Sequence, residues 1–131
     1  MAITVVAAII EDDAGLILCA KRGAWKDAPG KWEFPGGKPT DSETLEDALV
    51  REIREELSIE INLLKLFDRS KTAVGDTEID LVCFSARLVG DKPTGSTDHS
   101  ELSWRRQSEL ASLDWAEPDL PAVKKLTMPY C

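Results

Sequence analysis

The segment Gly37–Ile59 reads GKPTDSETLEDALVREIREELSI and decides the fold of this chain of 131 residues. Between Leu45 and Leu57 an apolar residue recurs at every fourth position, which predicts an α-helix with one apolar face turned toward a core. Thr44, with Asp47 three residues later, resembles a capping box and predicts where this helix begins. The segment therefore predicts a glycine turn followed by an amphipathic helix.

The polar side of the predicted helix carries three glutamates that can share one patch. Glu52 and Glu56 are four positions apart, and Glu55 follows Glu52 by three. Like charges at this spacing destabilise an isolated helix by roughly 0.2–0.5 kcal/mol per pair, so a cation should lie nearby. Clustered carboxylate oxygens suit Mg²⁺, for which Mn²⁺ could substitute. The alternative is a solvated acidic face with surface ion pairs to Arg51 and Arg54, but the glycine turn before the helix favours the metal site.

The charge of the chain limits its partners. Its 16 Lys and Arg residues against 24 Asp and Glu residues give a net charge of −8. This charge argues against a nucleic-acid polymer as partner, because such binding relies on a basic surface. A small-molecule nucleotide stays compatible, since a metal ion and a few local cations can accept its phosphates. The apolar run at the N-terminus is too short to cross a membrane, which excludes a membrane partner of that kind.

Length and composition indicate one domain, residues 1–131, that can bury a core of its own. Hydrophobic residues make up 43% and charged residues 31% of the chain, as in ordinary globular proteins. Cys19, Cys83 and Cys131 are widely spaced and have no CxxC or histidine partner. This pattern predicts reduced thiols in the cytoplasm and argues against structural zinc. We expect a monomer or a homodimer.

Strand and helix signals alternate over the rest of the chain. We predict strands at residues 3–10, 16–21, 32–34, about 60–69, 77–89 and 102–105, a polar loop at residues 90–100, and short helices near 107–112 and at 119–127. Turn signals such as Gly75-Asp76 separate the longer strands. This order predicts an α/β fold in which helices cover a mixed β-sheet.

The spacing that begins at Gly37 closely resembles the signature of the Nudix hydrolases. That signature is a glycine, five residues, a glutamate, seven residues, and then Arg-Glu-apolar-any-Glu-Glu-any-Gly-apolar. Glu43 and the block Arg51–Glu56 match every charged position, whereas Ser58 stands where the family usually has glycine. The resemblance implies a Nudix-type α/β/α sandwich around a mixed β-sheet. It also suggests that residue 58 is a helix C-cap in left-handed geometry, where serine would cost about 1 kcal/mol.

The segment Trp32–Lys38, WEFPGGK, resembles the MutT type of this family, and together with Val5–Ile10 it is similar to the branch that acts on CTP. The resemblance implies a Mg²⁺-dependent enzyme that converts a (d)NTP to a (d)NMP and pyrophosphate, with cytosine nucleotides slightly favoured. One alternative is an 8-oxo-dGTP-sanitising enzyme of the MutT type. Less favoured are a hydrolase of ADP-ribose or dinucleoside polyphosphates and a nucleotide sensor without turnover, since sensors usually lose signature glutamates.

The same resemblance implies roles for individual residues. Arg51 would orient the glutamates through salt bridges, and Glu43 would support the geometry of the loop and the helix. Arg22 and Lys38 match basic residues that contact phosphates, with ordinary surface charge as the alternative for both. The implied metal ligands are the backbone carbonyl of Gly36 and the carboxylates of Glu52, Glu55, Glu56 and Asp98.

A carboxylate must accept a proton from the attacking water, and our order of preference is Glu52, then Asp98, then Glu101. Asp98 and Glu101 lie in the region before Trp104, where the register of MutT-like chains selects Asp98. His99 is the single histidine of the chain. We interpret it as an exposed loop residue without a role.

Base recognition would involve Asp119 and Phe34. Asp119 matches the position of a base-reading residue, and its carboxylate suits an exocyclic amino group such as that of cytosine. A helix N-cap is the alternative for Asp119. Phe34 would either stack on the base or fill the core, and Trp25 is a looser aromatic candidate. Trp104 and Trp115 are expected to be packing residues.

Overall fold

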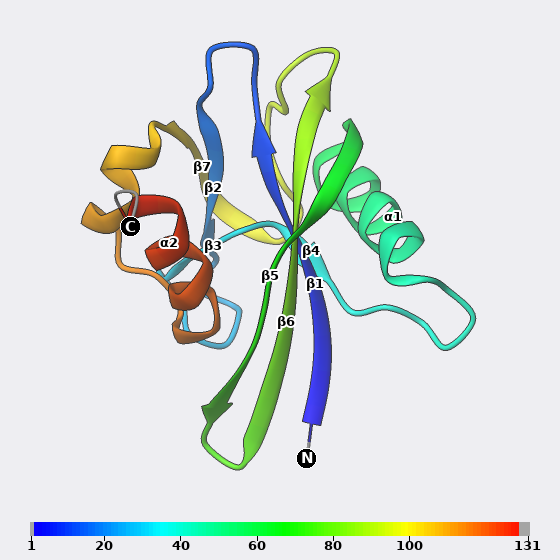
Figure 1. The fold of residues 1–131 in the computed structure, drawn as a ribbon, viewed down its shortest axis with the longest axis vertical. Coiled ribbons are helices and arrows are strands. Elements are labelled where there is room, and N and C mark those ends of the chain that lie inside the picture. The colour runs from blue at the N-terminus through cyan, green and yellow to red at the C-terminus, as the bar shows by residue number, and fades with distance from the viewer. Residues whose placement is uncertain (1, 129–131) are drawn as a thin grey trace.

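A central sheet separates two helices, α1 (Leu45–Leu57) and α2 (Leu120–Thr127), as Figure 1 shows. The computed structural model describes residues 2–128. Its other elements are β1 (Ala2–Glu11), β2 (Ile17–Arg22), β3 (Trp32–Glu33), β4 (Gly36–Gly37), β5 (Glu60–Val74), β6 (Thr77–Val89), β7 (His99–Arg105) and the 3₁₀ helices η1 (Gln107–Ser112) and η2 (Glu117–Asp119). The expected α/β/α sandwich is confirmed, because each helix packs on its own face of the sheet.

Strand β1 lies in the middle of a mixed sheet that has seven strands within residues 2–128. The strand order is β3-β2-β1-β6-β5, with β4 paired to β1 and β7 paired to β2. β1 and β6 run parallel from the pair Ala2–Glu78 to the pair Glu11–Arg87, whereas the neighbouring strand pairs are antiparallel. Because β4 pairs with the middle of β1, the glycine turn is held at the centre of the sheet.

Alternate side chains of β1 enter two separate cores, because successive side chains of a strand point to opposite faces. Val6, Ala8 and Ile10 are buried in the cluster that contains α1. Ala7 and Ile9 are buried in the cluster that contains α2. β1 is therefore covered on both faces, as expected for the central strand of a three-layer fold.

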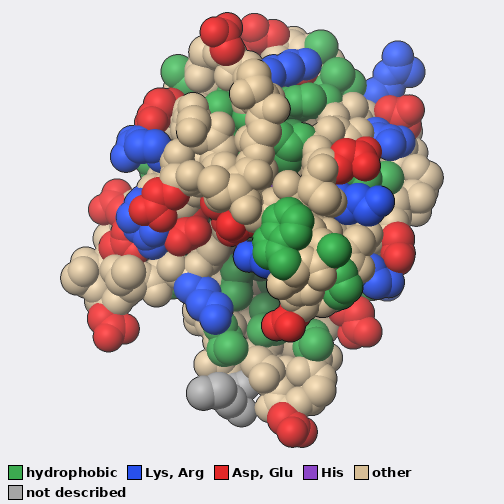
Figure 2. Space-filling model, turned by 180° about the vertical axis from the view of Figure 1, so that it is seen from behind, with side chains coloured by type: hydrophobic (Ala, Val, Ile, Leu, Met, Phe, Trp, Pro, Cys, Tyr) green, Lys and Arg blue, Asp and Glu red, His purple; other side chains and the backbone are tan. Residues whose placement is uncertain are grey.

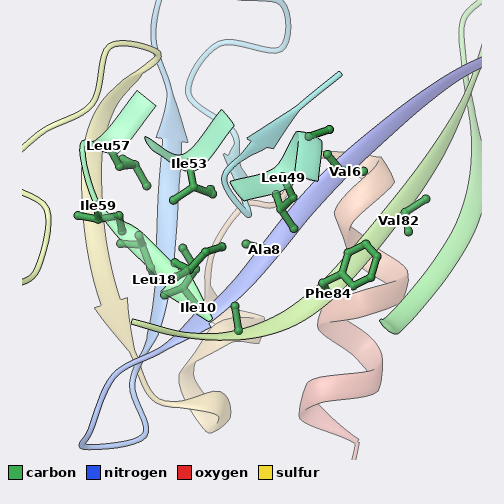
Figure 3. Packing of buried hydrophobic residues seen from close by; sticks show 13 residues of the cluster. Val6, Ala8, Ile10, Leu18, Leu49, Ile53, Leu57, Ile59, Val82 and Phe84 are labelled. Carbon is green, nitrogen blue, oxygen red and sulfur yellow. The ribbon is translucent and has the colours of Figure 1, made fainter. Parts of the chain in front are cut away.

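The apolar stripe predicted for α1 packs on the sheet. Leu49 and Ile53 are completely buried, and in Figure 3 they face the sheet residues Ala8 and Leu18. Burying one such side chain contributes roughly 1.5–3 kcal/mol, so the stripe holds the helix firmly in place. These core contacts fix the rotation of α1, and with it the direction of the glutamates on its other side.

Both ends of α1 agree with the prediction. Thr44 Oγ1 accepts a hydrogen bond from the N–H of Asp47 at 3.1 Å, and the helix begins at the next residue after Thr44. Ser58 follows the helix with φ 57° and ψ 37°, and its N–H donates to the carbonyl of Arg54 at 3.0 Å. The left-handed C-cap predicted at residue 58 is therefore confirmed, at a conformational cost of about 1 kcal/mol for a residue with a Cβ.

Two strands are longer than predicted. β5 continues past residue 69 to Val74, because its pairing with β6 runs as far as Val74 opposite Thr77. β7 begins at His99 rather than at residue 102, because His99 pairs with Arg22 of β2. The end of the predicted polar loop at residues 90–100 therefore belongs to the sheet.

The helices after β7 are short. The region near residues 107–112 is the 3₁₀ helix η1, and the predicted helix at 119–127 divides into the 3₁₀ turn η2 and the helix α2. Within residues 2–128 there is no helix with the length and apolar character needed to cross a membrane.

Candidate active site

The glycine turn before α1 has little room for side chains. A Cβ on Gly36 would overlap the backbone carbonyl of Val6 in β1. A Cβ on Gly37 would overlap the carboxylate of Glu52 in α1. Gly36 therefore has no room for a side chain against β1, whereas a side chain at residue 37 would need the Glu52 carboxylate to shift, and the turn brings the acidic side of α1 close to the sheet.

Arg51 is surrounded by three glutamates of the predicted site. Its Nε lies 2.6 Å from Glu43 Oε2, and its Nη1 lies 2.9 Å from Glu52 Oε1 and 3.0 Å from Glu55 Oε1. Its Nη2 donates to the carbonyl of Lys38 at 3.3 Å. We call Arg51 with these three glutamates the Arg51 network, and it ties the loop before α1 to the helix.

Glu43 holds Arg51 from the side of the loop. Hydrogen bonds from Arg51, and then the one from the backbone N–H of Thr40 at 3.0 Å, lower the pKa of Glu43 to about 2. The hydrogen bonds to Glu43 and Glu52 raise the pKa of Arg51. The pair is therefore ionised at any physiological pH. Figure 2 shows Asp and Glu side chains lying among Lys and Arg side chains on the face of the molecule seen there.

Glu56 carries a carboxyl group with an unsatisfied oxygen. The residue is 7% exposed, and its Oε2 has no hydrogen-bond partner among residues 2–128. Burial, and then contact with the carboxylate of Asp98, raises the pKa of Glu56 to about 9. Burial alone would also raise the pKa of Asp98, but the contacts with Glu56 and Lys26 lower it, with Lys26 Nζ 3.4 Å from Asp98 Oδ2. Of the two carboxyl groups, Glu56 therefore holds the proton and Asp98 the negative charge.

The donor set fits a hard divalent cation. Carboxylate oxygens are the ligands that Mg²⁺ prefers, and the candidates are Glu52, Glu55, Glu56 and Asp98. The unpartnered Oε2 of Glu56 would gain a partner, and Arg51 contacts only Oε1 of Glu52 and Glu55. Within residues 2–128 no three His, Cys, Asp or Glu side chains already converge as ligands. Ion binding would therefore require these side chains to move closer together.

The prediction that His99 is an exposed loop residue is wrong. Its side chain is 1% exposed, because β7 begins at this residue and pairs it with Arg22. Its Nε2 lies 2.8 Å from Glu33 Oε2, and its Nδ1 lies 2.8 Å from Ser96 Oγ. His99 therefore connects β3 with the segment that carries Asp98.

Glu33 is the candidate that the sequence analysis missed. Besides His99 it contacts Arg22, whose Nη1 donates to Glu33 Oε1 at 2.8 Å. Burial alone would raise the pKa of Glu33, but the hydrogen bonds from His99 and Arg22 lower it. The sequence contained a pattern that could have indicated a role for Glu33. Glu33 stands between the buried aromatic residues Trp32 and Phe34, and a carboxylate in such a strand needs cationic or hydrogen-bonding partners.

The other basic and aromatic candidates lie at different depths. Arg22 is 20% exposed, and its Nε also donates to the carbonyl of Asp27 at 2.5 Å, so its guanidinium is already engaged. Lys38 and Glu101 are exposed. Trp25 is also exposed. Arg22 therefore belongs to the buried contacts around Glu33, whereas the other three side chains face solvent.

Asp119 contacts the backbone of Phe34 instead of capping α2. Its Oδ2 accepts a hydrogen bond from the N–H of Phe34 at 3.0 Å, so Asp119 occupies the N-cap position of α2 but its side chain makes no capping bond there. Burial raises the pKa of Asp119 well above its usual value, and the charge of Glu33 acts in the same direction. Phe34 is buried against Trp115, with ring centroids 4.7 Å apart, so both aromatic residues lie in the core.

These contacts bring the candidates into one connected region. The charge of Glu33 contributes to the raised pKa of both Glu56 and Asp119, so Glu33 is near enough to influence both groups. A glycine turn, a helix with clustered carboxylates and an arginine that holds them are thus built into an α/β/α sandwich. This combination defines a phosphate-processing class of hydrolase site.

Comparison with known proteins shows the family to which this chain belongs. The family model described as the NUDIX domain matches residues 1–126, and the chain therefore belongs to the Nudix hydrolase family. The resemblance seen in the sequence is thus confirmed.

Several known proteins are similar to this chain over much of its length. The CTP pyrophosphohydrolase of Escherichia coli strain K12 is 39% identical over 124 residues, which cover 93% of this chain and 89% of that protein. The 8-oxo-dGTP diphosphatase of Proteus vulgaris is 38% identical over 80 residues, which cover 61% and 71%. The crystal structure of the MutT protein from Methanosarcina mazei Go1 has a TM-score of 0.85 at 23% identity and covers 95% of this chain and 92% of its own, which is a likeness of fold.

Proposed function

We propose that the chain is a Mg²⁺-dependent nucleoside triphosphate pyrophosphohydrolase. It converts a (d)NTP and water to a (d)NMP and pyrophosphate, with a slight preference for cytosine nucleotides. One observation carries the proposal: Arg51 holds two signature glutamates on the same helix as the buried Glu56, whose Oε2 is unpartnered within residues 2–128. The similarity to the E. coli CTP pyrophosphohydrolase supports the substrate class.

The metal would be held by oxygen ligands of the glycine turn, of α1 and of the segment before β7. These ligands are the carbonyl of Gly36 and the carboxylates of Glu52, Glu55, Glu56 and Asp98. When bound, Mg²⁺ neutralises charge on the phosphate oxygens and lowers the pKa of water, and Mn²⁺ could replace it. Arg51, itself held by Glu43, keeps Glu52 and Glu55 on one side of the helix, from which their carboxylates can turn toward a bound ion.

A carboxylate of the chain takes the proton of the attacking water. The water oxygen forms a bond to phosphorus, and the bridging P–O bond between the α- and β-phosphates breaks, so monophosphate and pyrophosphate separate. Glu52 is the first candidate for this base, Asp98 the second and Glu101 the third. The lowered pKa of Asp98 supports it as an acceptor, because the group stays ionised at neutral pH.

Substrate would be held at both ends. Arg22 and Lys38 contact the phosphates, and Asp119 reads the base while Phe34 fixes Asp119 through its backbone N–H. The buried Asp119 favours its protonated form. A protonated carboxyl group both donates and accepts hydrogen bonds. This property supports 8-oxo-dGTP as the second candidate substrate, as does the similarity to the Proteus vulgaris 8-oxo-dGTP diphosphatase.

We place this activity in one domain, residues 1–131, that works in the cytoplasm as a monomer or a homodimer. Its partner is a small-molecule nucleotide. The net charge of −8 supports this choice over a nucleic-acid polymer.

The test is pyrophosphate and phosphate release with and without Mg²⁺. The panel contains CTP, dCTP, 5-methyl-dCTP, dGTP, 8-oxo-dGTP, ADP-ribose and a dinucleoside polyphosphate. We expect Mg²⁺-dependent release of pyrophosphate, fastest with a cytosine nucleotide. Faster release from 8-oxo-dGTP would select the second candidate. Binding of nucleotides without any turnover would replace the enzyme with a sensor.

Base reading by Asp119 has its own test. Asp119→Asn keeps an oxygen that can accept the N–H of Phe34 but cannot carry the carboxyl proton. We expect the ratio of kcat/KM between dCTP and 8-oxo-dGTP to change by about tenfold, which is the value of one hydrogen bond. An unchanged ratio would remove Asp119 from base recognition.

A further inference from the structure

His99 lies in the interior between two polar partners from different parts of the chain. Its side chain is 1% exposed, and each ring nitrogen has one partner at 2.8 Å, Glu33 on Nε2 and Ser96 on Nδ1. Glu33 is 66 residues from His99 along the chain and belongs to β3. A histidine held at both nitrogens in this way cannot rotate without breaking two hydrogen bonds.

The neighbouring groups determine which nitrogen of His99 carries the proton. Glu33 also accepts a hydrogen bond from Arg22, so it acts as a carboxylate acceptor, and His99 Nε2 must be the donor toward it. Ser96 Oγ accepts the backbone N–H of Asp98 at 3.2 Å, so its own hydroxyl proton is free to donate to Nδ1. A proton on Nε2 toward Glu33, with the Ser96 hydroxyl facing Nδ1, therefore satisfies every group in the set.

The Ser96 side of this arrangement reaches Asp98. Ser96 holds the N–H of Asp98, while the N–H of Thr97 donates to the backbone carbonyl of Glu56 at 3.2 Å. The short segment around Asp98 is thus fixed by His99 on one side and by the end of α1 on the other. The Asp98 carboxylate is placed next to Glu56 by these backbone contacts, not by its own side chain alone.

We infer that His99 is a positioning residue with two separate tasks. Through Ser96 it fixes the segment that presents Asp98, and through Glu33 it fixes the guanidinium of Arg22. A single imidazole thereby sets the distance between a carboxylate that acts on water or metal and an arginine that holds phosphate. The inference rests on the proposed function for the roles of Asp98 and Arg22, but the contacts of His99 can be tested without it.

The first test uses the fact that the chain has a single histidine. The imidazole ¹⁵N spectrum of the ¹⁵N-labelled protein therefore reports His99 directly. We expect one tautomer, protonated on Nε2, and an altered Nε2 signal in Glu33→Gln. A tautomer protonated on Nδ1, or averaging between both tautomers, would overturn the inference.

The second test separates the two tasks kinetically. The amide of Asn lies near the place of Nδ1 and that of Gln near the place of Nε2, so His99→Asn keeps the Ser96 contact and His99→Gln keeps the Glu33 contact. We expect about a tenfold lower kcat with little change in KM for His99→Gln and Ser96→Ala. For His99→Asn we expect mainly a higher KM.

Ser100→Ala is the matched control, because this exposed serine lies on the same strand and its hydroxyl donates to the backbone carbonyl of Lys21 rather than to the His99 ring or to Asp98. We expect its kcat and KM to equal those of the unchanged protein. The inference is overturned if Ser96→Ala behaves like Ser100→Ala. It is also overturned if His99→Asn and His99→Gln change kcat and KM in the same proportion, since a role in stability alone predicts that result.

A third measurement makes failure of this inference distinguishable from failure of the proposed function. Amide hydrogen exchange of Asp98 should accelerate about tenfold or more in Ser96→Ala and stay unchanged in Ser100→Ala, whether or not a nucleotide is hydrolysed. If the unchanged protein hydrolyses no nucleotide in the panel, the proposed function is rejected. The ¹⁵N spectrum and the exchange rates still test whether His99 and Ser96 make the contacts described. Unchanged exchange at Asp98 would overturn the positioning role.

Discussion

The Arg51 network and the group around His99 hold charged side chains in opposite ways. The first reaches the surface at Glu55, whose side chain is 60% exposed, and it shares one arginine, 29% exposed, among three carboxylates. The second is centred on His99, whose side chain is 1% exposed and whose ring nitrogens have one partner each. Solvent can replace a lost contact in the first region, whereas a buried group in the second that loses its partner stays unsatisfied, at a cost of about 1–3 kcal/mol. The exposed region can therefore rearrange around a ligand, and the buried region supplies the fixed frame.

The largest effect is expected where the two regions meet, at Glu56. Glu56→Gln keeps the shape of the buried, protonated carboxyl group but removes its capacity to become an anion, so a cation would lose a charged ligand. We expect Mg²⁺-dependent kcat/KM to fall on the order of a hundredfold while the melting temperature changes little. Steady-state pyrophosphate release and thermal unfolding measure both quantities.

Glu60→Gln is the control for that substitution. Glu60 lies at the start of β5, and its exposed side chain forms an ion pair with Arg54 of α1. Its activity should stay that of the unchanged protein. Glu55→Gln should resemble Glu56→Gln in activity. Near-normal turnover in both Glu55→Gln and Glu56→Gln would remove the metal assignment.

The next effect concerns Arg51 itself. Arg51→Lys keeps the charge, but one ammonium group cannot make the separate contacts that the guanidinium makes with Glu43, Glu52 and Glu55. We expect kcat/KM to fall about tenfold or more, with partial rescue by higher Mg²⁺ concentration. Titration of activity against Mg²⁺ checks this.

Arg54→Lys is the control, because it makes the same substitution of arginine by lysine at a surface ion pair with Glu60. Its Mg²⁺ titration should coincide with that of the unchanged protein. Equal behaviour of Arg51→Lys and Arg54→Lys would mean that the Arg51 network has no part in the activity.

A smaller effect is expected at the end of α1. Ser58 has positive φ, so Ser58→Gly removes backbone strain and should raise the free energy of unfolding by about 1 kcal/mol. For a chain of this length that corresponds to a rise in melting temperature of about 3–5 °C. Thermal unfolding gives the shift, and an unchanged or lower melting temperature would contradict the account of this cap. Activity should not change.

The smallest effect is expected from an ion pair far from the site, on the β5–β6 hairpin. Arg69 Nη2 lies 2.8 Å from Asp80 Oδ2, and this hydrogen bond lowers the pKa of Asp80. A lowered pKa in the folded state stabilises the fold above the unfolded pKa of about 3.9, and the contribution is lost as pH falls through the folded pKa. The stability lost in Asp80→Asn should therefore be constant near neutral pH and shrink below about pH 4.

Urea unfolding at several pH values measures that difference. Asp13→Asn, in an exposed turn, is the control for replacing an aspartate with an amide. A stability difference for Asp80→Asn that grows as the pH falls would contradict the sign.

The contrast between the two regions also explains what could be predicted from the sequence. The Arg51 network is built mostly from residues one to eight positions apart, so it lies within one short sequence signature, and the resemblance of that signature to the Nudix family implied it. The bounds of α1 were predictable for the same reason, because its apolar period and its cap at Thr44 are local. His99 and Asp119 depend on partners 66 and 85 residues away, Glu33 and Phe34, and no local pattern shows such contacts.

The end of β5 was missed for a different reason. Residues 68–71 read Asp-Arg-Ser-Lys, which lacks the apolar alternation of a half-buried strand. The strand continues there because β6 supplies a full set of backbone partners. Pairing with an adjacent strand therefore decided the structure where side-chain pattern did not.

The parallel pairing of β1 with β6 has a consequence for synthesis of the protein. β1 is made first, yet its neighbour along the whole strand spans Glu78–Arg87 and leaves the ribosome much later. Until then the apolar segment AITVVAAIIE has an open edge, and α1 has no completed surface on which to dock. We expect nascent chains that stop before residue 87 to be captured by chaperones or to aggregate, and the carboxylates proposed to bind metal to come into place only after β6 has been added.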